Sequence, residues 1–123
     1  MPYRTFWEPK GIYWQHYGMV TAEEIFEANN TFYSDRRSDN AHYQIIDCLN
    51  VEHIELDETA MLKMAAFDKA HSETTHQLKL AFIGVAQPLL SVFDDYIRHS
   101  QKLDSPWKMK TFETLQAARN WLG

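Results

Sequence analysis

The chain of 123 residues predicts one α/β domain, in which a β-hairpin opens a mixed sheet and helices then alternate with strands. Two observations carry this prediction. Aromatic-rich segments at 3–7 and 12–17 surround a proline and a glycine that suit a tight turn. Apolar runs at 43–51 and 78–84 are each followed by a helical pattern, which is typical of a strand that feeds a helix. We therefore expect about four helices and right-handed βα crossovers after the hairpin.

The first helix is expected directly after the hairpin. Gly18 is predicted to end the second strand, and Thr21 and Glu24 have the spacing of a capping box. Apolar residues recur at helical spacing as far as Phe32, and the polar stretch 34–40 then closes the helix as a solvated loop.

A carboxylate-rich turn is expected after the third strand. It contains His53, Glu55, Asp57 and Glu58, and Asp57 can cap a helix that runs to about His71. Because these anions already occupy the helix N-terminus, that terminus is poorly suited to hold a phosphate. The alternate spacing of the first three side chains could also bind zinc, but a solvated acidic turn is the favoured interpretation.

The last three elements follow the same alternation. Gly84 marks the end of the strand at 78–84, and Pro88 suits the first turn of a helix that runs to about Lys102. A short strand is predicted at 107–112. The final helix has a buried stripe made of Leu115, Ala118 and Leu122.

Composition argues against several classes of function. The 17 acidic residues outnumber the 12 basic ones, and the basic residues are dispersed, which argues against a nucleic-acid surface. The longest nearly uncharged stretch, 80–93, is too short to span a bilayer. The first residues lack the apolar core of a signal peptide, so a cytoplasmic location is expected. The single cysteine, Cys48, is interpreted as a buried core residue.

Three segments resemble a known family. The third strand ends in the pattern Asp47-x-x-x-Val51-x-x-Ile54 before a helix, the segment 11–24 combines a strand, a glycine and a capped helix, and 111–122 ends in a Trp-Leu pair. Together they resemble the STAS domain family, and in particular its SpoIIAA-like branch. The resemblance implies one SpoIIAA-like domain over residues 1–123.

The resemblance also implies where a regulatory site would lie. Regulatory STAS members have an Asp-Ser-Ser-Gly turn whose second serine is phosphorylated, but this chain has Glu55-Leu56-Asp57-Glu58 there. The hydroxyl acceptor is missing, so we expect no phosphorylation switch at this position, and Asp57 is interpreted as a helix cap. If the domain docks a protein partner as STAS regulators do, Glu55, Asp57 and Glu58 are the expected contact residues.

Aromatic residues are numerous enough to line an apolar pocket, although ordinary packing also explains them. The SpoIIAA-like branch is similar in fold to the CRAL-TRIO lipid carriers, which implies a pocket for a nonpolar small molecule or lipid. We expect it between the sheet and the helices after Gly18 and Gly84, lined by Trp14, Phe32, Phe82 and Phe93.

No catalytic or cofactor motif stands out, so the chain is expected to be a non-catalytic binding module without a cofactor. The alternative is a phosphorylation-independent protein-interaction module. A homodimer is left open, and a metal enzyme or hydrolase is a third and weaker alternative.

Overall fold

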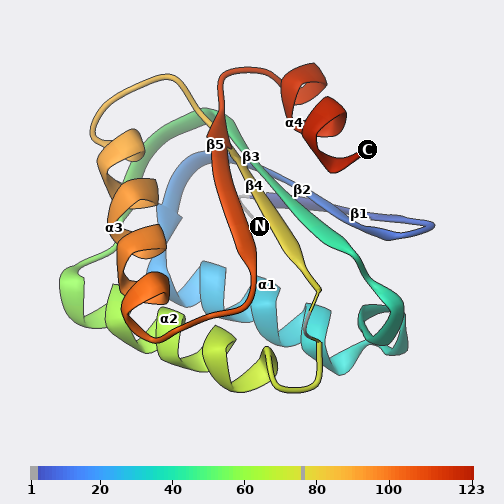
Figure 1. Cartoon of the computed structure of the whole chain (residues 1–123). Coiled ribbons are helices and arrows are strands. Elements are labelled where there is room, and N and C mark those ends of the chain that lie inside the picture. Colours follow the sequence, from blue (N-terminus) through green and yellow to red (C-terminus); the bar gives the residue numbers. More distant parts are fainter. Residues whose placement is uncertain (1–2, 76) are drawn as a thin grey trace.

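A computed structural model describes residues 3–75 and 77–123, and it shows a five-stranded sheet with helices on both faces (Figure 1). The elements in chain order are β1 (Tyr3–Glu8), β2 (Gly11–Thr21), α1 (Ala22–Ser34), the 3-10 helix η1 (Arg36–Asn40), β3 (Tyr43–Glu55), α2 (Glu58–His71), β4 (Lys79–Ile83), α3 (Leu89–Lys102), β5 (Lys108–Phe112) and α4 (Leu115–Leu122). The predicted order of strands and helices is confirmed, and η1 is a short addition within the predicted loop.

The strands lie side by side in chain order, from β1 to β5. β1 and β2 pair antiparallel as the predicted hairpin, and the other neighbouring strands pair parallel. The crossovers through α1, α2 and α3 all proceed in one direction across the sheet, and a common handedness puts these helices on one face (Figure 1). The last helix, α4, covers the opposite face.

Side chains of the central strands alternate between two cores. In β4, Leu80 and Phe82 belong to the core under α1, α2 and α3, whereas Ala81 and Ile83 belong to the core under α4. All four are buried, as expected for a parallel strand covered on both faces. On the α4 side, Ala118 is fully buried, and Leu115 and Leu122 pack beside it, which confirms the stripe predicted for this helix.

Helix caps are confirmed where the sequence predicts them. The hydroxyl of Thr21 accepts a hydrogen bond from the backbone N–H of Glu24 at 3.4 Å, and the Asp57 carboxylate accepts one from Ala60 at 2.8 Å. α2 therefore begins directly after Asp57. None of the helices in the part of the chain that the structure describes is long and apolar enough to cross a membrane.

The second and third strands are longer than predicted. Gly18 does not end β2: it has a φ of +65° and lies beside a register shift, and the strand continues to Thr21. This extension pairs with β3, so that Met19 lies opposite His53 and Thr21 lies opposite Glu55. The prediction that His53 and Glu55 lie in a turn was therefore wrong, because β2 supplies backbone partners that the carboxylate-rich sequence does not reveal.

We expect Gly84→Ala to destabilise the fold, because a methyl group there would meet two packed side chains. A Cβ atom would lie 2.8 Å from Leu89 Cδ2 and 3.0 Å from Phe93 Cε2. Such overpacking typically costs about 1–3 kcal/mol, which urea unfolding can measure. The control is Val85→Ala, because Val85 is 59% exposed and its truncation should change the free energy of unfolding by less than about 0.5 kcal/mol. Equal effects of the two substitutions would contradict the packing argument.

Candidate ligand-binding cavity

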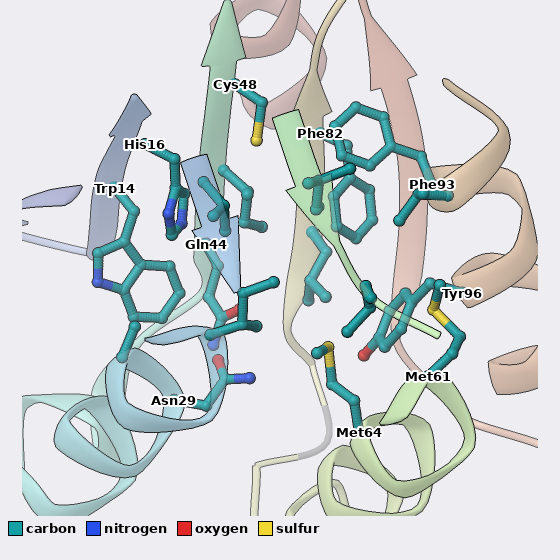
Figure 2. Close-up of a pocket in the computed structure, with 18 of the residues that line it drawn as sticks. Trp14, His16, Asn29, Gln44, Cys48, Met61, Met64, Phe82, Phe93 and Tyr96 are labelled. Atoms are coloured by element: carbon teal, nitrogen blue, oxygen red, sulfur yellow. The ribbon is translucent and has the colours of Figure 1, made fainter. Parts of the chain in front are cut away.

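A cavity of about 70 Å³ lies between the sheet and the helices α1, α2 and α3 (Figure 2). Strands β2, β3 and β4 supply its floor, and all three helices contribute to its walls. Its lining is predominantly apolar, with a few polar side chains among aliphatic, aromatic and thioether groups. This is the composition expected of a site for a small organic molecule.

The structure brings together three of the four aromatic residues expected to form a pocket. Trp14, Phe82 and Phe93 line the cavity, with Trp14 on one side and the two phenylalanines on the other (Figure 2). The Phe82 and Phe93 rings pack against each other with centroids 5.0 Å apart. Phe32 does not line the cavity: it is fully buried behind Trp14, and its ring stacks on Trp7 at 5.6 Å.

Met61 and Met64 give the α2 wall a deformable surface. Both side chains are buried and project from α2 toward the cavity (Figure 2). Methionine is unbranched and can change rotamer at little cost, so it adapts to irregular spaces. This wall can therefore change shape more readily than the aromatic wall formed by Phe82 and Phe93.

A buried carboxylate joins the three helices at the cavity. Asp68 of α2 accepts hydrogen bonds from the hydroxyl of Tyr33 of α1, at 2.8 Å, and from the hydroxyl of Tyr96 of α3. Burial raises the pKa of Asp68 to about 6, and the two hydrogen bonds oppose that rise. Burial and the negative charge of Asp68 raise the pKa of both tyrosines, which therefore remain protonated donors at neutral pH.

Sequence reasoning missed Asp68, although a signal was present. Asp68 follows Met61, Met64 and Ala65 at helical spacing, so it falls on the same apolar face of α2. A charged residue on that face has to be paired when the helix packs. The tyrosine partners come from positions 35 and 28 residues away, and no local pattern identifies them.

Three uncharged polar side chains also line the cavity, and the sequence analysis missed them too. They are His16 of β2, Asn29 of α1 and Gln44 of β3, and all are buried. His16 Nδ1 and Gln44 Nε2 have no hydrogen-bond partner within residues 3–75 and 77–123. The alternation of side chains along a strand could have identified two of them. His16 follows Ile12 and Trp14 at alternate positions, and Gln44 precedes Ile46 and Cys48 in the same way.

The predicted partner-binding residues lie outside the cavity on two sides of Leu56. Glu55 and Asp57 border an open surface groove at the ends of β2 and β3, whereas Glu58 borders a second groove between α2 and α3. In that second groove, Glu58 lies 4.0 Å from His99. Leu56 lines both grooves and the cavity, so its side chain separates the buried space from the surface.

His53 and Glu55 are exposed on the extended end of β3, with His53 Nε2 and Glu55 Oε1 3.8 Å apart, while Asp57 caps α2. Among the residues that the structure describes, no group of three or more His, Cys, Asp or Glu side chains is arranged to hold a metal ion. Cys48 is buried in the cavity lining, and burial raises the pKa of its thiol.

We expect Asp57→Ala to destabilise the fold by about 1 kcal/mol, because it removes the oxygen that caps α2. Occupancy of the cavity should not change. Glu55→Ala is the control, since this exposed carboxylate caps no helix and its loss should have an effect of less than about 0.5 kcal/mol. A loss of binding in Asp57→Ala protein with unchanged melting would show that the carboxylate acts in binding and not as a cap.

The raised pKa of Asp68 predicts a specific dependence of stability on pH. Since the pKa rises from 3.8 to about 6 on folding, the folded protein binds this proton more tightly than the unfolded chain does. The resulting stabilisation is complete below the unfolded pKa and is lost as the pH rises through 6. A shift of this size corresponds to about 3 kcal/mol.

Urea unfolding of the wild type and of Asp68→Asn at several pH values between 4 and 7.5 tests this expectation. The wild type should gain stability relative to the variant as the pH falls, because asparagine has no proton to bind in this range. Subtracting the free energy of unfolding of the variant from that of the wild type removes the contribution of all other titrating groups. A difference that is constant with pH would refute the assignment.

Comparison with solved structures identifies a neighbour in fold. An uncharacterized protein of the DUF3478 family from Shewanella loihica PV-4, which has a SpoIIAA-like fold, superposes with a TM-score of 0.59 at 16% sequence identity. The match covers 98% of this chain and 92% of the other. No family model matches the sequence. No curated protein matches it either. The expected fold is therefore confirmed: this chain has a SpoIIAA-like α/β fold.

Proposed function

We propose that the chain is a non-catalytic binding module that holds a small nonpolar molecule in the cavity between the sheet and α1, α2 and α3. The observation that carries this proposal is a largely apolar cavity whose wall includes a small number of buried polar groups. Ligand sites have this composition, because apolar surface supplies affinity and a few polar groups fix orientation. Both oxygens of Asp68 already accept hydrogen bonds from tyrosine hydroxyls, which supports a structural role for this carboxylate rather than a catalytic one.

The volume of the cavity limits the size of the ligand. At about 70 Å³, it is smaller than an engineered apolar cavity of about 150 Å³ that binds benzene. A ligand of a few heavy atoms fits after modest rotamer changes of Met61 and Met64. A lipid chain needs more space, and displacement of Leu56 would supply it by joining the cavity to the two surface grooves.

The alternative function, a phosphorylation-independent protein-interaction module, is supported by a different surface. Leu49 and Val85 are 43% and 59% exposed, and both border a hollow between the end of β3 and the loop before α3. Exposed apolar side chains that share a hollow are typical of contact surfaces. This surface does not depend on an open cavity, so the two functions can be tested separately.

Xenon and organic extraction test the binding proposal directly. Xenon enters small dry cavities, so pressurised samples should show saturable shifts of backbone amide NMR signals at Ile46, Phe82 and Phe93. Organic extraction of freshly purified protein, followed by mass spectrometry, should identify any ligand that copurifies. The absence of saturable shifts and of an extracted ligand would contradict the proposal.

A cavity-filling variant provides the matched control. Cys48→Met should abolish the xenon shifts, because the longer side chain extends into the space that Cys48 now borders. Leu49→Met introduces the same side chain at the next position, which is exposed and does not line the cavity, and it should leave the shifts unchanged. Equal effects of the two variants would show that xenon binds elsewhere.

A further inference from the structure

Two of the polar side chains that line the cavity, Gln44 and Asn29, lie together beside α1. Figure 2 shows the Gln44 side-chain amide extending down from β3 and the Asn29 amide pointing up toward it from α1, while the hydroxyl of Tyr96 lies at a similar level across the cavity. Gln44 is 3% exposed and Asn29 is 7% exposed, so neither amide is solvated at the surface. Apart from that hydroxyl, the side facing them is formed mainly by aromatic rings and thioethers.

Gln44 Nε2 is a buried donor without a partner in the described part of the chain. An unpaired buried amide is costly, so native proteins satisfy nearly all such groups. Its place in the wall of a cavity means that a molecule inside can satisfy it. The complementary atom is a hydrogen-bond acceptor, such as the oxygen of a carbonyl or a hydroxyl group.

The same wall has no positive charge to stabilise an anion. No lysine or arginine lines the cavity among the residues that the structure describes. Burial lowers the pKa of His16 to about 4, so its imidazole is neutral at physiological pH. Asp68 adds a negative charge to the lining when it is ionised. A ligand carboxylate would lose its hydration here and gain no counter-charge.

We infer that this cavity selects an uncharged molecule with a hydrocarbon body and a carbonyl, amide or hydroxyl end, and that the Gln44 amide binds that polar end. The inference deepens the proposed function and rests on it. It also excludes free fatty acids as the preferred occupants, because they would bring a carboxylate to a wall without a cation. Asn29, which lies opposite Gln44, offers a second amide to the same polar end (Figure 2).

A matched set of four-carbon probes tests this selectivity. Butanamide, butanoate and butylamine each contain four carbon atoms and differ in charge at pH 7.5. Their affinities can be measured from the shifts of backbone amide signals during NMR titration, with xenon as the purely apolar reference. We expect butanamide to bind at least tenfold more tightly than either charged probe.

Substitution of Gln44 separates its hydrogen bond from the shape of the cavity. Gln44→Met keeps a similar length and removes the amide, so butanamide should bind at least fivefold more weakly while xenon binding is retained. In the empty protein the same change should raise the melting temperature by about 4 °C, because it removes an unpaired buried amide. Gln101→Met makes the same chemical change at an exposed position of α3 and should alter neither quantity.

A second pair of variants tests the same inference in case Gln44→Met does not fold. Asn29→Leu removes the other amide from the cavity, and Asn30→Leu is its exposed neighbour in α1. Asn29→Leu should weaken butanamide binding, and Asn30→Leu should not. If butanoate or butylamine binds as well as butanamide, or if neither cavity variant changes butanamide binding, the inference is overturned while the proposed function stands. If neither xenon nor any probe binds, the proposed function fails and this inference fails with it.

Discussion

The hydrogen bonds to Asp68 are the interaction on which the arrangement of the helices depends. One carboxylate on α2 accepts a hydrogen bond from a tyrosine hydroxyl of α1 and another from a tyrosine hydroxyl of α3. Three helices that are separate in sequence therefore meet at a single buried group. Removal of either hydroxyl would leave a partly compensated charge in an apolar layer, which is strongly unfavourable. Tyr33 is fixed further, because its ring stacks on His71 of α2 with centroids 3.7 Å apart. The network thus fixes the spacing of the helices over the sheet, and the cavity is the space that remains between them.

The sequence predicts those features whose cause is local. A proline and a glycine make the hairpin turn, Thr21 and Asp57 cap their helices through N–H groups three residues away, and alternating apolar runs identify the strands. The extension of β3 to Glu55 was missed because its cause is pairing with the end of β2, beyond the irregularity at Gly18. Asp68 was missed for the same reason, since its partners lie on other helices. Trp14, Phe82 and Phe93 lie around one cavity because the alternation of side chains along a strand and the helical repeat determine which face an aromatic ring occupies.

Gln44 departs from the apolar pattern that the stability of the fold favours. β3 is covered on both faces, and the residues that alternate with Gln44 along the strand toward the cavity, Ile46 and Cys48, are apolar or nearly so. An apolar residue at position 44 would satisfy the requirements of packing and leave no unpaired donor. Polar residues that break the local pattern without an evident structural partner are characteristic of functional sites. The same reasoning does not apply to Asp68, because its hydrogen bonds to two tyrosines account for its burial.

The walls of the cavity differ in the contacts that hold them, and under the proposed function this difference would determine where a larger ligand fits. Tyr96 is fixed by Asp68, and Phe82 packs against both Phe93 and Tyr96, so the α3 wall is held by ring contacts and a hydrogen bond. The α2 wall consists of methionines, and beyond Met61 lies Leu56, in the short link between β3 and α2. Leu56 is only partly buried and borders both surface grooves, so its displacement would open the cavity toward the surface. On the proposed function, a longer hydrocarbon body would extend toward Leu56, while its polar end would stay beside Gln44. If the chain holds a ligand as proposed, the start of α2 is the part of this fold most directly coupled to the size of that ligand.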